Sequence, residues 1–471
     1  MIKKIISNLF YQASYQVLLI LLPIVTVPIV SNALGSQGIG IYNFINSITN
    51  YFVLFAGLGI ANYGVREISL AKDDPNKLSK TFWEIEILNA GIAFIVFLFY
   101  LFFAFFQDMS LYYYFQSLVI LGTLLDISWY YQGIEDFKHI TMANFIVKIV
   151  SFMLILFFVN SYSDLWIYIL IQSANILVSQ IILWLFVFKK IFFVNIDFKG
   201  VFSHLYPACN YFISKIATTI YLNVNKTTLG LMVSSSAVGI FTNTTVIPVM
   251  VNSIIGAADM VLLPRMTDIF KTNEDKGIRL LDLSLHIQLF LTIPIYFGFL
   301  TINEKFINWF LGPSFSDVSK YLPLASTIVI IIPLGASIVR QYLVPKNEIR
   351  FVNVTSILAA IINVITGFAL IYKFSVLGAV VSNVITEFFV TISRISFLRK
   401  KTSFKFNLSE IVKFSVSGFI MFFSVSLITS SLEANMLTTF IQIILGVVIY
   451  LIFCYVLKSK TIIQLVSTLK K

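Results

Sequence analysis

The feature that most constrains this chain of 471 residues is the regular return of apolar stretches long enough to cross a lipid bilayer. A helix needs about 20 mostly apolar residues to span the hydrocarbon core. Charged residues make up only 12% of the chain, whereas they make up about 25% of an ordinary soluble domain. These observations exclude soluble enzymes and nucleic-acid-binding proteins. They predict an all-α polytopic membrane protein, because the short alternating segments of a membrane β-barrel are absent from the sequence.

Fourteen stretches meet this length requirement, and the charges between them indicate an orientation. If both termini are cytoplasmic, 25 of the 33 lysine and arginine residues fall in cytoplasmic segments and three in outer loops. Positively charged loops remain in the cytoplasm, so this imbalance favours fourteen transmembrane helices with both termini cytoplasmic. The expected spans are residues 9–32, 40–63, 83–106, 113–131, 140–160, 165–187, 208–233, 240–262, 283–303, 320–342, 351–372, 376–398, 411–430 and 436–457.

The two halves of the chain repeat a pattern of glycine and arginine. Gly57 and Arg66 correspond to Gly256 and Arg265 at one offset of 199 residues. An even number of helices in each half makes the halves parallel, related by an axis along the membrane normal. The alternative is that any two polytopic halves share such features. We expect two parallel six-helix bundles and two additional C-terminal helices, with domains at residues 1–200, 201–405 and 406–471.

Two lysines fall inside the seventh expected span. Lys215 and Lys226 are eleven residues apart, which is three helical turns, so they share one helix face about 16 Å apart along the axis. A helix this polar cannot face lipid and is expected to line an aqueous cavity. Two lysines along that path would suit an anionic group such as phosphate. The other candidate substrate-binding residues of this span are Asn210, Ser214, Thr219 and Tyr221.

Further polar stripes follow the first, second and eighth expected spans and would complete the walls of a central cavity. The alternative explanation is packing between helices, which glycine and asparagine also support. Prolines in these helices would offer kinks for gating, because proline removes a backbone hydrogen bond. The cavity residues are Gln12, Gln16, Asn46, Asn50 and Asn252, and the gating prolines are Pro23 and Pro248.

Charged residues inside the expected spans need a partner or water, because lipid offers neither. Glu387 is the only carboxylate near mid-membrane, and it fits a proton or sodium coupling site as well as a buried, protonated structural glutamate. Asp259, Arg340 and Arg394 lie near the ends of their spans, where their side chains are expected to extend to the interface. Asp259 is in addition a candidate for coupling or gating.

Other charged positions allow two interpretations each. Asp126 and Lys148 lie at similar depth on consecutive spans, which fits an ion pair or a functional role. Arg66 and Arg265 end the second and eighth spans and are gating candidates.

Patterns for catalysis or metal binding are absent from the sequence. The histidines are scattered, and Cys209 and Cys454 lie in separate apolar segments, so neither a metal site nor a disulfide is expected. Asp73 and Asp74 are the nearest approach to the metal-binding pair of a glycosyltransferase, in a loop too short for an active site. We therefore expect no enzyme and no cofactor, with a proton or sodium gradient as the energy source.

The N-terminal third carries motifs that resemble a known family. The motifs lie at residues 28–35, 38–42, 57–60, 63–68 and 132–135. They resemble the Wzx-type oligosaccharide flippases of the multidrug/oligosaccharidyl-lipid/polysaccharide (MOP) exporter superfamily. Ile29 and Asn32 depart from the family pattern, in which an aromatic residue and an arginine are usual, so no outer cation is expected there.

The resemblance implies a function. Such flippases move undecaprenyl-pyrophosphate-linked oligosaccharide repeat units from the inner to the outer leaflet of the bacterial plasma membrane by alternating access, for capsule, O-antigen or exopolysaccharide synthesis. It also implies a cavity lined by the first, second, seventh and eighth helices, with the bilayer and polysaccharide polymerases as partners and no nucleic acid. The alternatives are a flippase for lipid II-type peptidoglycan precursors and a cation-coupled multidrug exporter of the same fold. A cationic cavity disfavours cationic drugs.

Overall fold

The computed structural model describes residues 2–461 and 463, and the regular elements in these residues are all helical. Ten of the described helices are long and apolar enough to cross a membrane. Contacts between residues divide the chain into two compact units, Met1–Gly230 and Leu231–Lys471.

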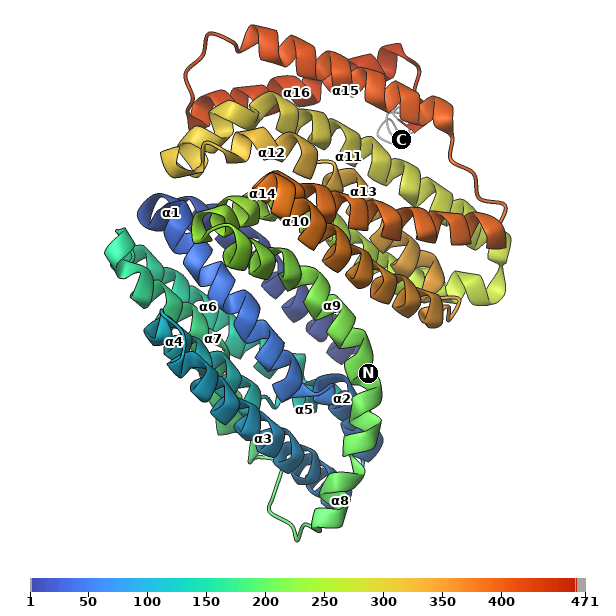
Figure 1. The fold of residues 1–471 in the computed structure, drawn as a ribbon. Coiled ribbons are helices and arrows are strands. Elements are labelled where there is room, and N and C mark those ends of the chain that lie inside the picture. The colour runs from blue at the N-terminus through green and yellow to red at the C-terminus, as the bar shows by residue number, and fades with distance from the viewer. Residues whose placement is uncertain (1, 462, 464–471) are drawn as a thin grey trace. The chain divides into compact units, whose positions relative to one another are not determined.

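The first unit is a bundle of long helices (Figure 1). Its elements are α1 (Ile2–Gly57), α2 (Ile60–Ala71), α3 (Pro75–Phe105), α4 (Ser110–Leu124), α5 (Ser128–Gly133), α6 (Phe137–Phe158), η1 (Tyr162–Asp164), α7 (Leu165–Val187), α8 (Phe198–Ser203) and α9 (Leu205–Met232). Helix α1 packs against α3, α4 and α6. It bends at Gly35, whose φ of 65° interrupts the helical backbone, a conformation that glycine adopts without steric cost. Two of the expected spans are therefore joined in one kinked helix.

The expected span at 113–131 is not one continuous helix. Helix α4 ends at Leu124 and α5 begins at Ser128. The Asp126 carboxylate accepts the backbone N–H of Ser128 at 2.9 Å, and the Trp129 indole donates to the Asp126 carbonyl at 2.7 Å. Asp126 therefore binds the first residues of a new helix, and no ion pair with Lys148 occurs among the side chains described.

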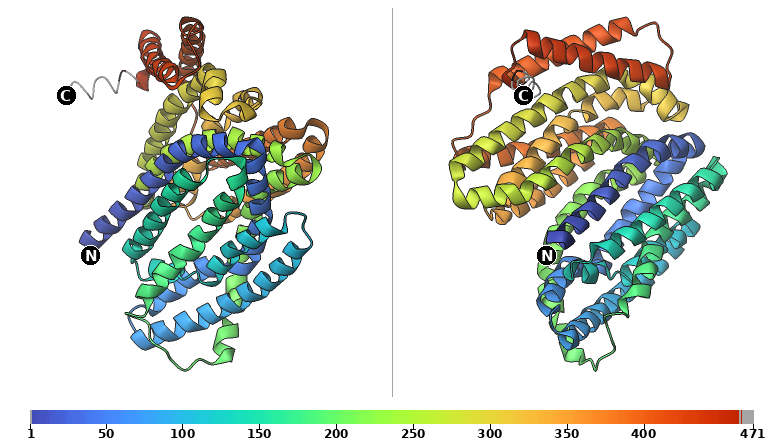
Figure 2. Two further views of the ribbon diagram at one scale, coloured as in Figure 1. Left: turned by 90° about the vertical axis from the view of Figure 1, so that its left-hand side faces the viewer. Right: turned by 180° about the vertical axis from the view of Figure 1, so that it is seen from behind.

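The second unit contains further long helices and a C-terminal hairpin (Figure 2). Its elements are α10 (Ser235–Thr272), α11 (Glu274–Phe310), η2 (Pro313–Phe315), α12 (Val318–Ala325), α13 (Ile328–Ile338), the π-helical turn η3 (Val339–Leu343), α14 (Ile349–Lys401), α15 (Leu408–Ile428) and α16 (Met436–Val456). At Ser375, a residue with φ of 52°, α14 folds back on itself and so contains two expected spans. The Thr366 and Ser382 hydroxyls lie 2.7 Å apart across this turn. The expected span at 320–342 is instead divided among α12, α13 and η3.

Polar contacts fasten the C-terminal hairpin to α11. The Lys305 ammonium group donates to the carbonyls of Thr429, Ser430 and Leu432 at the end of α15. The Trp309 indole donates to the Thr439 hydroxyl of α16 at 2.9 Å. Carbonyls at a helix end have no partner within the helix, so the lysine supplies donors that lipid cannot supply.

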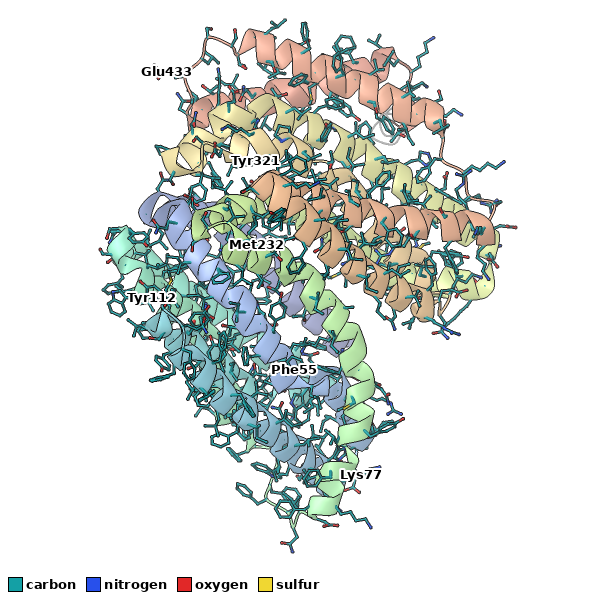
Figure 3. The ribbon with its side chains drawn as sticks, in the orientation of Figure 1. Phe55, Lys77, Tyr112, Met232, Tyr321 and Glu433 are labelled. Carbon is teal, nitrogen blue, oxygen red and sulfur yellow. The ribbon has the colours of Figure 1, made fainter. Side chains whose placement is uncertain are left out.

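Large apolar side chains cover the outside of the helices (Figure 3). On α3, Phe99, Phe102 and Phe105 are 66%, 66% and 69% exposed. In the same view Lys77 and Tyr112 mark opposite ends of the first unit. An exposed apolar surface this large is unfavourable in water, so these helices present it to the hydrocarbon core of a membrane.

Gly59 provides a test of the helix packing in the first unit. A methyl group at Gly59 would lie 2.5 Å from the Ala208 carbonyl oxygen, and Gly59 has φ of 75°. We expect Gly59→Val to destabilise the protein by about 1–3 kcal/mol from backbone strain alone and by more from the steric clash. The apparent melting temperature in detergent measures this. Gly91→Ala is the control, because a methyl group there meets nothing within 4 Å; equal melting temperatures for the two variants would contradict the packing.

Candidate functional site

Polar side chains join α1 to α9 within the first unit. The Ser47 and Thr227 hydroxyls lie 2.9 Å apart, and the Tyr51 hydroxyl lies 3.2 Å from the same Thr227 oxygen. About one turn away, the Asn50 amide donates to Asn223 Oδ1 at 3.4 Å. Residue numbers rise on α1 as they fall on α9, so the two helices are antiparallel. We call these five residues the polar ladder.

Close contacts extend this antiparallel pairing beyond the polar ladder. A methyl group at Gly230 would lie 2.0 Å from the Phe44 ring, and the rings of Phe55 and Phe212 pack with centroids 5.7 Å apart. Figure 3 shows Phe55 on the α1 segment beside α9. Interhelical hydrogen bonds in membranes contribute on the order of 0.6 kcal/mol each, so the apolar contacts and small residues are needed to hold α9 in place.

Lys215 extends from α9 to the end of α1. Its Nζ lies 3.4 Å from the position that a Cβ on Gly57 would occupy, so the ammonium group fills the space that this glycine leaves. Lys226 lies three turns away on α9 and is partly buried beside the polar ladder residue Thr227. Among the described side chains, neither lysine forms an ion pair. Two cations without a carboxylate partner form a candidate anion-binding surface.

The other residues predicted on this surface are distributed along α9 and α1. The backbone carbonyl of Thr219 accepts a hydrogen bond from the Asn223 side-chain amide at 2.9 Å. Of the remaining predicted residues, Tyr221, Gln16 and Asn46 are partly buried and Asn210 is exposed. The side chains of Gln12 and Ser214 lie outside the described residues.

Four residues of the polar ladder were not predicted from the sequence as site residues. Ser47 and Tyr51 are four residues apart, as are Asn223 and Thr227. This spacing places each pair on one helix face. It indicates two polar faces but does not indicate that they face each other, which only the structure establishes.

A second polar cluster lies within the second unit, around Asp259 of α10. The Asp259 carboxylate accepts hydrogen bonds from Ser337 Oγ and Gln341 Nε2, each at 2.7 Å. Arg340 Nη1 lies 3.7 Å from Asp259 Oδ2 and donates to the Gly256 carbonyl at 3.1 Å. The expectation that Asp259 extends to the membrane interface is wrong, since the residue is only 3% exposed.

Two further side chains from α11 complete this cluster. Gln288 donates to Ser337 Oγ at 2.9 Å, and Gln341 donates to Ser284 Oγ at 2.9 Å. Side chains from α10, α11, α13 and η3 therefore share one hydrogen-bonded network. We call it the Asp259 cluster; its members are Asp259, Ser284, Gln288, Ser337, Arg340 and Gln341.

The remaining coupling and cavity candidates of the second unit lie on separate elements. Asn252 donates to the Ile328 carbonyl at 3.3 Å, which ties α10 to α13. Glu387 is partly buried on α14, where its carboxylate interacts electrostatically with Arg394. Pro248 lies inside α10, which remains helical across it.

The gating candidates outside these clusters are at helix surfaces or inside helices. Arg66 is exposed and pairs with the adjacent Glu67 at 2.9 Å. Arg265 is exposed on α10, and Pro23 lies inside α1. In the described part of the chain, no three histidine, cysteine or acidic side chains gather where they could hold a metal ion.

Comparison with solved structures identifies the fold of the protein. A structure titled "Lipid II flippase MurJ, inward closed conformation" superposes with a TM-score of 0.72 at 15% identity, covering 96% of this chain and 98% of that chain. An inward-facing multidrug resistance MATE family transporter of the MOP superfamily superposes with a TM-score of 0.57 at 11% identity, covering 83% and 98%. At these identities the likeness concerns the fold, which is that of MOP-type transporters.

Comparison of the sequence identifies the family as well as the fold. Residues 5–270 match the family described as "Polysaccharide biosynthesis protein", and the chain belongs to this family. A protein of Escherichia coli (strain K12) named "Putative O-antigen transporter" is 24% identical over 399 residues, which cover 83% of this chain and 96% of that protein. The chain is a multi-pass protein of the inner membrane and a transporter rather than an enzyme.

Disulfide crosslinking tests the polar ladder. In a chain with Cys209 and Cys454 replaced by serine, we expect Ser47→Cys and Thr227→Cys together to form a disulfide on mild oxidation, because the native hydroxyls are 2.9 Å apart. A gel shift with a thiol-reactive mass tag measures the bond. The control pairs Thr227→Cys with Ser36→Cys, eleven residues back from Ser47 on the same side of the break at Gly35 and so about 16 Å away along that helix. Equal crosslinking of both pairs would contradict the antiparallel pairing.

Proposed function

We propose that this protein is a flippase for undecaprenyl-pyrophosphate-linked oligosaccharide repeat units. It moves them from the inner to the outer leaflet of the bacterial plasma membrane for synthesis of a capsule, O-antigen or exopolysaccharide. Membership of the polysaccharide biosynthesis family and the name of the Escherichia coli relative support this substrate class. The single observation that carries the proposal is the presence of Lys215 and Lys226 on the polar face of α9, without carboxylate partners among the described residues.

The proposed mechanism uses these two lysines in sequence. A pyrophosphate group binds one ammonium group and passes to the other, about 16 Å along the helix axis, while the polyprenyl chain stays in the bilayer. Both lysines lie on α9, so they keep their spacing as the protein alternates between its two access states, and the polar ladder holds α9 against α1. The kinked α1 and the prolines Pro23 and Pro248 supply bending points for that change.

We further propose fourteen membrane crossings with both termini in the cytoplasm. Helices α1 and α14 each contain two of the expected spans, which raises the ten apolar helices to twelve crossings. Helix α4 is short and α9 is polar, and these two would add the last two crossings. The excess of lysine and arginine on one side then supports the cytoplasmic placement of the termini.

The energy source in this proposal is a proton or sodium gradient, with Glu387 as the coupling carboxylate. The fold shared with ion-coupled transporters is compatible with such coupling. The partners are the lipid-linked oligosaccharide, the surrounding bilayer and the polysaccharide polymerase that would use the product. A lipid II-type precursor is the second candidate substrate, because its head group also carries pyrophosphate and the MurJ fold covers 96% of this chain. Cationic drugs are disfavoured, because the two lysines would repel them.

Neutralising the lysines tests the proposed path. We expect Lys215→Gln to reduce flipping about tenfold or more, because a hydrogen bond to a charged group contributes about 1.5–3 kcal/mol. Lys215→Glu should abolish flipping by repelling the pyrophosphate. The measurement is the protein-dependent arrival of a fluorescent undecaprenyl-pyrophosphate oligosaccharide in the opposite leaflet of proteoliposomes.

The matched control is Lys77→Gln, which removes the same charge from the end of the first unit (Figure 3). Its flipping rate should equal that of the wild-type protein. Wild-type flipping by Lys215→Glu would contradict the lysine path. A wild-type protein that moves lipid II but not the oligosaccharide substrate would instead favour the second candidate.

A separate variant tests the coupling role of Glu387. If its carboxylate carries the coupling proton, Glu387→Gln should remove the dependence of flipping on an imposed pH gradient. Flipping by the wild-type protein should respond to the same gradient, as should flipping by the control variant Glu348→Gln. A Glu387→Gln variant with an unchanged gradient dependence would return Glu387 to a structural role beside Arg394.

A further inference from the structure

Each unit places a cation against a glycine at the same position of the internal repeat. Gly57 and Gly256 correspond at the offset of 199 residues. A Cβ at Gly57 would lie 3.4 Å from Lys215 Nζ, and a Cβ at Gly256 would lie 3.1 Å from Arg340 Nη1. In both units the glycine leaves room for the charged tip of a side chain from another helix of that unit.

Arg340 is held more rigidly than an arginine that extends freely to an interface. Its Nη1 donates to the Gly256 carbonyl at 3.1 Å and lies 3.7 Å from Asp259 Oδ2. Asp259 is fixed in turn by Ser337 and Gln341. A guanidinium group has five N–H donors, and the described contacts use one of its nitrogen atoms. The Arg340 side chain is 34% exposed, so the other donors are accessible to a ligand.

The backbone at Arg340 departs from a regular α-helix. The Val344 amide bonds to the Val339 carbonyl at 2.9 Å, a five-residue step that defines the π-helical turn η3. Adjacent residues of an α-helix point about 100° apart. In η3, adjacent Arg340 and Gln341 both reach the Asp259 carboxylate. Single π-helical turns inside helices occur mostly at functional sites.

We propose that Arg340 is a second phosphate-binding residue, the counterpart of Lys215, and that Asp259 is its positioning residue. This inference rests on the proposed function and names the residue of the second unit that recognises the pyrophosphate. The planar guanidinium group suits a phosphate because it can donate two parallel hydrogen bonds. Asp259 and the Gly256 carbonyl fix the orientation of the guanidinium group. They also reduce the free-energy cost of its positive charge when no phosphate is bound. A purely structural ion pair would need neither the exposed donors nor the π-helical turn.

Ligand binding to the full-length protein in nanodiscs tests this role. The probe is farnesyl pyrophosphate, a soluble polyprenyl pyrophosphate, and the dissociation constant is measured by calorimetry. We expect Arg340→Gln to weaken binding at least tenfold. The double variant Asp259→Asn with Arg340→Gln should regain any melting temperature lost in the single variants, because no unpaired charge remains, yet it should bind as weakly as Arg340→Gln.

Two further variants separate binding from folding. Arg350→Gln is the matched control, since Arg350 is exposed ten residues away; it should bind like the wild-type protein. Gly256→Val should weaken binding by displacing the guanidinium group while retaining both charges. Gly298→Val is its control, because a methyl group at Gly298 meets nothing within 4 Å.

The outcomes distinguish this inference from the proposed function. Wild-type binding that survives in Arg340→Gln, or in the double variant, would make the Arg340–Asp259 pair purely structural and leave the proposed function intact. No binding of the pyrophosphate probe by the wild-type protein would contradict the proposed substrate class, and this inference with it. Weak binding by Arg340→Gln, the double variant and Gly256→Val, beside normal binding by both controls, would establish the role.

Discussion

The structure depends on one constraint: lipid offers no partner for a polar group, so each polar side chain in a spanning helix must find its partner within the protein. The constraint accounts for the polar ladder between α1 and α9. It also accounts for the Asp259 cluster, where four elements of the second unit surround one carboxylate. At the end of α15 the same constraint explains why Lys305 donates to three backbone carbonyls. Lys215 and Lys226 stand apart, because neither forms an ion pair with the described side chains.

Much of the fold could be predicted from hydropathy, since the apolar stretches indicate where helices cross the membrane. The interruptions could not, because they depend on contacts distant in sequence. The break before α5 is stabilised by Asp126 and by Gln180, whose side chain accepts the Ile127 amide at 3.2 Å. The short polar segments at Gly35 and Ser375 indicate the ends of spans, and a single non-helical residue lies at each of these positions in α1 and α14. In α14 the chain turns back there, since Asn363 donates to the Thr386 hydroxyl at 3.1 Å.

The candidate site could likewise be predicted from the sequence only in part. The number of polar residues on α9 is enough to predict that it avoids lipid, and the eleven-residue spacing places Lys215 and Lys226 on one face. The partners of that face are set by the packing of α1, so the spacing of Asn223 and Thr227 indicates a polar face but not the helix that it meets. Depth along a helix was misleading for Asp259. Its position near the end of a span indicated an exposed carboxylate, whereas neighbours from α11, α13 and η3 bury it.

The internal repeat shows how the same backbone feature serves two different charges. Two glycines that lie 199 residues apart in the chain leave the same space, one in each unit. A cation fills that space from a different element in each unit, Lys215 from α9 and Arg340 from η3. A lysine carries its charge on a flexible stem and needs only that space, whereas an arginine must also be oriented in its plane. Orientation requires a fixed acceptor, and a fixed acceptor in the membrane requires its own hydrogen-bond donors. The six-residue Asp259 cluster is therefore the structural consequence of an arginine in the space beside the glycine, which a lysine fills in the first unit.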